Sequence, residues 1–191
     1  SGRAYNIICE LLGSNWYAVA ATVALGALAV CHIVYAFILT AQNRSARGAN
    51  RYEVTAKPEK VEWASQNMLV LGIIVLLGLA LHLFNFWYNM MFAELVGMRT
   101  VLEPTDGFGL ICATFQNKVY VILYVIWIVA LWYHLSHGFW SAMQTIGING
   151  KVWFNRWKVI GTVYVTLLML AFLVVVLAFA FGCAPSLHCA A

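Results

Sequence analysis

The sequence predicts an all-α fold, a bundle of transmembrane helices that forms a single domain over residues 1–191. The chain is 63% hydrophobic and only 9% charged, which is too apolar to cover the surface of a soluble domain. The charges are also segregated, because residues 11–43, 63–93, 119–150 and 159–191 contain none. Each of these stretches exceeds the roughly 20 residues that a helix needs to cross a bilayer.

Four spans follow from these charge-free stretches. Their apolar residues run continuously instead of alternating, which favours helices over membrane strands. The expected spans are Asn15–Gln42, Ala64–Phe92, Asn117–Ile146 and Arg156–Phe181, joined by loops 43–63 and 147–157 on one side of the membrane.

Basic residues predict the orientation of the bundle. Eight Lys and Arg residues lie in the segments Arg44–Glu62 and Lys151–Lys158, whereas the opposite side has Arg3, Arg99 and Lys118. Cytoplasmic loops carry such an excess, so loops 43–63 and 147–157 are expected in the cytoplasm and both ends of the chain outside. The net charge of +4 is thus a topology signal, and no nucleic-acid partner is expected.

Cysteines provide no redox or metal motif. The five cysteines form neither a C-x-x-C nor a C-x-x-C-H pattern. Cys9, Cys112, Cys183 and Cys189 fall on the expected outer side, where disulfides are stable, but their pairing cannot be derived from the sequence.

Four histidines lie inside the spans: His32, His82, His134 and His137. Ionisable residues inside a membrane are often functional, although a helix–helix hydrogen bond is the simpler alternative. His32 and His134 each lie about 10 residues from the cytoplasmic ends of parallel helices, so their imidazoles can face each other. His82 lies ~12–15 Å further outward.

A facing pair of neutral imidazoles suits the iron of haem b. A zinc site formed by His32, His134 and His137 is a weaker alternative, because catalytic zinc needs access for water. Gly138 and Ser141 share the His134 face and leave room for a haem ring; close packing of membrane helices is a frequent alternative, and only the register of these residues with His134 favours haem. His137 is expected to bond a haem propionate or a backbone carbonyl, or to make a simple polar contact.

Five stretches carry a resemblance to a known family: YNIICELLGSNWYA, QNRSARGANRYEV, KVEWASQNMLVLG, LHLFNFWYNMMFAEL and YHLSHGFWSAMQTIGIN. With them the chain resembles the cytochrome b membrane anchor of succinate dehydrogenase and fumarate reductase, in the di-haem form of Bacteroidetes-like bacteria. The resemblance covers essentially the whole chain. Its most specific part is the H-x-x-x-G-[hydrophobic]-[aromatic] motif that begins at His134.

The resemblance implies five spans, of which this chain has the last four, and two haem b groups. His32 and His134 would hold the proximal haem, and His82 would hold the distal haem with a histidine of the absent helix. Some family members carry a glutamate two residues before the fourth-helix histidine, which is proposed to conduct protons. This chain has Trp132 at that position, so that proton route is not expected here.

The resemblance also implies a function and partners. The chain would anchor a flavoprotein and an iron–sulfur subunit to the bacterial cytoplasmic membrane and pass electrons to a quinone such as menaquinone. A dimer of the whole complex is also considered. The basic loops would dock the partner subunits, although the positive-inside bias alone explains these loops. Arg44, Lys151 and Arg156 would pair with haem propionates.

A quinone site needs an apolar cleft with a few polar groups. The candidates near the outer end are Glu10, Asn85, Tyr88 and Asn89, with Glu10 as a proton relay or, more plainly, a solvated interfacial residue. Two other functions stay open. The chain could be a haem b anchor of a different quinol-linked dehydrogenase. It could also be a transporter or structural membrane subunit whose histidines make hydrogen bonds between helices.

Overall fold

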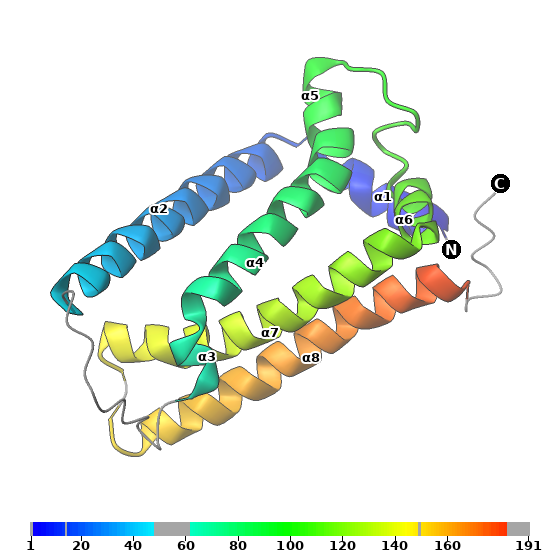
Figure 1. Cartoon of the computed structure of the whole chain (residues 1–191). Coiled ribbons are helices and arrows are strands. Elements are labelled where there is room, and N and C mark those ends of the chain that lie inside the picture. Colours follow the sequence, from blue (N-terminus) through cyan, green and yellow to red (C-terminus); the bar gives the residue numbers. More distant parts are fainter. Residues whose placement is uncertain (1, 14, 48–61, 149, 183–191) are drawn as a thin grey trace.

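The computed structural model describes residues 2–13, 15–47, 62–148 and 150–182, which are almost wholly helical and include no β-strand (Figure 1). Most of the predicted loop 43–63 lies outside these described residues. The helices are α1 (Gly2–Gly13), α2 (Trp16–Arg47), α3 (Trp63–Gln66), α4 (Met68–His82), the π-helix η1 (Leu83–Phe92), α5 (Ala93–Val96), α6 (Gly107–Gln116), α7 (Lys118–Ile146) and α8 (Trp153–Phe181).

Four helical segments are long and apolar enough to cross a membrane: Trp16–Ala46, Met68–Val96, Lys118–Ile146 and Trp153–Phe181. The predicted four-span, all-α bundle is therefore confirmed, and the chain is a multi-pass membrane protein. Three of these helices continue a few residues beyond one end of the predicted span, to Ala46, to Val96 and back to Trp153, whereas Lys118–Ile146 stays within its predicted bounds. A helix of 29 residues measures about 43 Å, so its ends reach beyond a hydrocarbon layer that is about 30 Å thick.

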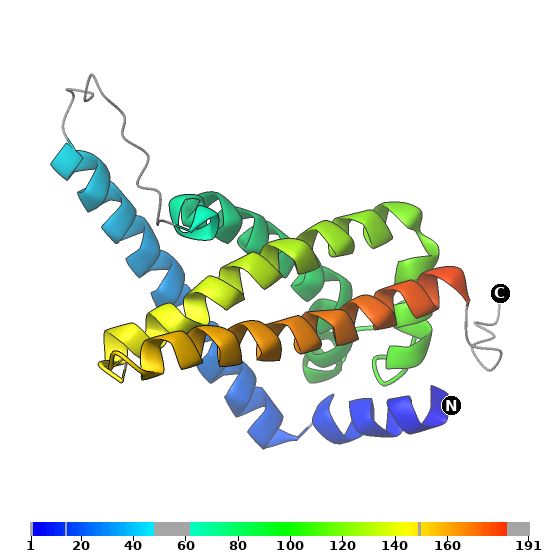
Figure 2. The ribbon, with the colours of Figure 1, turned by 90° about the horizontal axis from the view of Figure 1, so that it is seen from below.

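Helices α7 and α8 lie side by side along their lengths, and α4 packs against α7 (Figures 1 and 2). The Cβ atom of a side chain at Gly161 would overlap with the ring of Phe139, so this glycine lets α8 approach α7 closely. The buried core extends from α6 into this pair of helices and consists of Ile111, Phe115, Val121, Tyr124, Ile128, Val165, Met169 and Val176.

Helix α2 stands apart from this three-helix unit (Figure 1). No residue in its most apolar part is buried, and its closest backbone contacts are with α1 near its own start. The side chains of α2 therefore remain open to lipid or to a ligand along most of its length.

One end of the bundle carries α1 and α6 and is called the α6 end; the opposite end, with the connection between α7 and α8, is called the turn end. At the α6 end, Asn6 of α1 donates from Nδ2 to Asp106 Oδ1 (2.8 Å) and accepts from the backbone N–H of Phe108 (2.9 Å). Asp106 also accepts from the N–H of Gly109 (3.0 Å), as the N-cap of α6. Asn6 thus completes the cap of a helix far away in the sequence.

Close packing and covalent chemistry also mark the α6 end. An added Cβ at Gly107 would come within 2.5 Å of Cys9 Sγ and 2.9 Å of the Tyr5 ring, so α1 lies directly on the start of α6. Burial raises the pKa of the Cys9 thiol and, together with the neighbouring Cys9, that of Tyr5 to about 12. Cys112 on α6 is disulfide-bonded, whereas Cys9 and Cys31 carry free thiols.

Candidate functional site

The imidazole rings of His32 on α2 and His134 on α7 lie next to each other, with centroids 6.1 Å apart and planes at 82°. An imidazole nitrogen lies roughly 1 Å from its ring centroid and a metal–nitrogen bond is about 2 Å long, so a centroid separation of about 6 Å leaves room for both imidazoles to bind one metal. His32 and His134 would be the residues that hold a haem iron, which would supply a one-electron redox centre.

The surroundings of this pair fit a flat, apolar ligand. A Cβ added to Gly138, one turn from His134, would meet no atom within 4 Å. Buried Nδ1 of His134 has no hydrogen-bond partner among the described residues. His32 is exposed on the helix that stands apart from the bundle. The donor set of two imidazoles and the space beside them agree with a haem b group.

The described residues do not bring the three histidines of the alternative zinc site together as one group. No group of three or more His, Cys, Asp or Glu residues that could hold a metal ion occurs in the described part of the chain, which includes His32, His134 and His137. His137 instead has a carboxylate neighbour. Its Nδ1 lies 3.6 Å from Oε2 of Glu62, the residue that precedes α3.

Glu62 joins three helices at the turn end. It accepts a hydrogen bond of 2.7 Å from Lys158 Nζ on α8, and this bond lowers the pKa of the Glu62 carboxyl. The Lys158 ammonium also lies 4.5 Å from the ring centroid of Trp140, which packs against His137 at 4.6 Å. The contact of His137 with Glu62 agrees with the simple polar contact that the sequence left open, and its bond to a propionate stays a prediction.

His82 lies at the end of α4 inside an aromatic cage. Its ring centroid is 5.4 Å from that of Trp127, 6.2 Å from Tyr124 and 5.2 Å from Phe86. Trp127 and Tyr124 precede His134 by seven and ten residues, which corresponds to about 10–15 Å along α7. His82 is thus nearer the α6 end by about the distance that the helix lengths predict. Its role as an iron ligand stays a prediction.

The π-helix η1 begins directly after His82, and π-helical turns often occur at functional sites. It carries three of the predicted quinone residues. Asn85 is buried and its Nδ2 donates to Tyr124 Oη (3.4 Å). Asn89 donates to two backbone carbonyls of the π-helix, including that of Asn85 (3.1 Å). Tyr88 is exposed at 38%.

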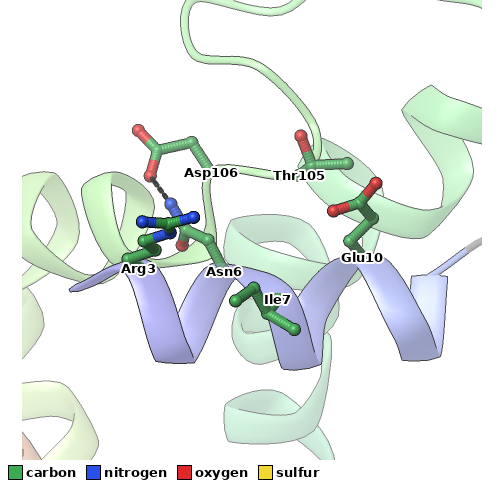
Figure 3. A pocket seen from close by; sticks show the side chains of 6 residues that line it. All are labelled: Arg3, Asn6, Ile7, Glu10, Thr105 and Asp106. Atoms are coloured by element: carbon green, nitrogen blue, oxygen red, sulfur yellow. Dashed lines mark hydrogen bonds between the residues drawn. The ribbon is translucent and has the colours of Figure 1, made fainter. Parts of the chain in front are cut away.

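Glu10 lies elsewhere, in an open cavity of about 490 Å³ at the α6 end (Figure 3). Figure 3 shows the carboxylates of Glu10 and Asp106 on the same side of α1, near Thr105. The cavity is lined by Arg3, Asn6, Ile7, Glu10, Thr105 and Asp106. The predicted quinone residues are therefore divided between this polar cavity and the π-helix.

The remaining predicted residues make local contacts. Arg44, Lys151 and Arg156 are exposed, and none of them forms an ion pair among the described residues. The guanidinium of Arg156 lies 5.2 Å from a ring centroid of Trp153. The backbone carbonyl of Ser141 accepts from Thr145 Oγ1 on the same helix (3.0 Å). The pairing of Arg44, Lys151 and Arg156 with haem propionates stays a prediction.

Trp132 has a structural role that its sequence position does not reveal. Its indole N–H donates to Thr166 Oγ1 (2.8 Å) and so ties α7 to α8. Glu62, Tyr124 and Trp127 are further site residues that the sequence prediction missed. Only Glu62 had a sequence signal, as the acidic residue directly before a charge-free span.

Comparisons with known proteins identify no relative. No model of a protein family, no curated protein and no solved structure matches this chain at a significant level. The histidine geometry and the resemblance of the motifs are therefore the grounds on which a function can be proposed.

Proposed function

We propose that this chain binds haem b between His32 and His134 and passes electrons in a membrane-bound succinate:quinone oxidoreductase. The observation that carries the haem assignment is the 6.1 Å separation of the two imidazole rings. The motifs around His134 support the choice of complex, because they resemble the cytochrome b anchor of that enzyme. The protein has four helices that are long and apolar enough to cross a membrane, which agrees with four of the five spans that the resemblance implies.

In this proposal, the residues at and around His32 and His134 have different roles. His32 and His134 hold the iron, and haem b supplies a one-electron carrier between soluble and membrane-bound redox partners. Gly72 of α4 lies behind His134, since a Cβ there would be 3.7 Å from Cε1 of His134. His82 would contribute one ligand to a second haem b nearer the α6 end.

The turn end would face the cytoplasm of a bacterial cell, where the flavoprotein and the iron–sulfur subunit dock. The α6 end would then face outward, and the disulfide at Cys112 supports this orientation because disulfides persist in oxidising compartments. A quinone would react near this end, with Glu10 exchanging protons with water in its cavity, while Asn85, Tyr88 and Asn89 lie apart from that cavity on the π-helix. The whole complex could assemble as a dimer.

A reduced-minus-oxidised absorption spectrum of the purified protein tests the haem assignment. His134→Ala should abolish the proximal haem signal, whereas His137→Ala, three residues further along the same helix, should keep it. Equal loss in both variants, or a wild-type protein without a haem spectrum, would contradict the proposal and favour a transporter or structural subunit. Co-purification with a flavoprotein and an iron–sulfur protein distinguishes the proposed complex from a different quinol-linked dehydrogenase.

A further inference from the structure

A second hollow, of about 300 Å³, lies at the turn end where α7 connects to α8. It is lined by Ile148, Gly150, Trp153 and Trp157, so its wall consists mainly of carbon. The indole N–H of Trp157 already donates to the backbone carbonyl of Ile148 (2.8 Å). The hollow therefore offers apolar surface and not a set of directed polar groups.

Two cations are neighbours of the lining residues. The guanidinium of Arg156 lies over the ring of Trp153, which lines the hollow, and Lys151 follows the lining residue Gly150 in the sequence. Both side chains are exposed, and neither pairs with a carboxylate within the described ranges. Lys158, by contrast, is neutralised by Glu62. Positive charge thus lies beside a carbon-lined cavity.

The hollow lies at the level where the membrane meets water. The α7 span ends at Ile146 and the α8 span begins at Trp153, so Ile148 and Gly150 lie in the connection and Trp153 and Trp157 lie in the first turns of α8. Tryptophan is enriched at this depth. Ile148 and Val152 are 51% and 61% exposed, so apolar side chains are open to the surroundings of the protein here.

We propose that the α7–α8 turn binds an anionic phospholipid, with its glycerol and upper acyl region in the hollow and its phosphate near Lys151 and Arg156. Basic pockets beside membrane helices on the cytoplasmic side bind anionic headgroups in this way. A protein subunit is the competing occupant. The lipid is favoured because the wall is apolar, the volume is small and the hollow lies at the membrane boundary.

Native mass spectrometry of the delipidated full-length protein tests this site with phosphatidylglycerol and phosphatidylcholine as probes. Phosphatidylglycerol should bind more tightly, and Arg156→Gln or Lys151→Gln should weaken its binding by about fivefold each. Arg99→Gln removes the same charge from an exposed position at the α6 end and should leave the affinity unchanged.

Equal affinity for the two lipids, or equal weakening by Arg99→Gln and Arg156→Gln, would overturn the proposal. Unchanged phosphatidylglycerol binding in both turn variants would also overturn it and would favour a protein occupant. The circular dichroism and melting temperature of each variant are measured first. If Arg156→Gln does not fold, the exposed Lys151 provides the test alone. The inference does not depend on haem binding.

Discussion

The indole ring of Trp127 on α7 occupies the position where a side chain at Gly78 on α4 would lie. Its N–H donates to the backbone carbonyl of Val75 one turn earlier on α4 (3.0 Å). The same ring packs against His82. The absence of a side chain at Gly78 therefore allows α4 to pack closely against α7, with Trp127 in contact with His82.

Gly78→Ala should destabilise the protein because its new methyl group would overlap with Trp127. Overpacking of this kind costs about 1–3 kcal/mol. Thermal unfolding in detergent, followed by circular dichroism, measures the loss. The control is Gly26→Ala on α2, where an added Cβ meets nothing within 4 Å and the change should stay within about 0.5 kcal/mol. Equal melting temperatures for the two variants would show that Trp127 is free to move.

The Glu62 cluster should contribute an acid-sensitive part of the stability. Because Lys158 holds the pKa of Glu62 below its ordinary 4.5, this contribution is full above that ordinary value and is lost as the pH falls through the folded-state pKa. Glu62→Gln should therefore lower the melting temperature more at about pH 7 than at about pH 4. Lys158→Gln should act in the same direction. A loss that is the same at both pH values would refute the ion pair.

Asn6→Ala should release α1 from α6, because it removes the hydrogen bonds that Asn6 makes to Asp106 Oδ1 and to the N–H of Phe108. Loss of a cap costs about 1 kcal/mol, and undocking would expose the Cys9 thiol that now lies against Gly107. Labelling by a maleimide, followed on the Cys9 peptide by mass spectrometry, should become faster. Ile7→Ala, a change at an exposed site on the same helix, should leave the labelling rate unchanged.

Glu10→Gln should slow quinone-linked turnover of the assembled complex if Glu10 exchanges the protons of quinone chemistry. The side chain lines the cavity at the α6 end, so the loss should appear in turnover while the haem spectrum is kept. Glu103→Gln is the matched control, because Glu103 is an exposed carboxylate outside that cavity. Unchanged turnover in Glu10→Gln would leave Glu10 as a solvated surface residue.

The spans could be predicted because charge is excluded from a bilayer core, and this constraint acts on every residue of a helix. The helix ends could not, because Lys and Arg mark the membrane boundary while the helix continues beyond it, as at Arg44 on α2. The hydrogen bonds of Asn6 at the start of α6 could also not be predicted from the sequence. The bond to Asp106 joins residues 100 positions apart, and no local pattern encodes such a contact.

The proximity of His32 and His134 could be predicted from helix rise alone, because depth in a membrane depends on residue count. The neighbours of His137 could not be predicted in this way. Its contact with Glu62 depends on how α3 packs against α7, and the depth of a residue in the membrane does not tell in which direction its side chain points. For the same reason, Glu10 and Asn85 were placed at one outer level, whereas Glu10 lines an open cavity and Asn85 is buried against Tyr124.

The separate position of α2 has a consequence for how the protein is assembled. Since α7 packs against both α4 and α8, and α2 buries no side chain in its apolar part, these three helices pack together with little contribution from the helix that carries His32. A ligand held by both His32 and His134 would therefore add a direct connection between α2 and the other helices. Binding of the ligand would then contribute to the cohesion of the bundle as well as to its function.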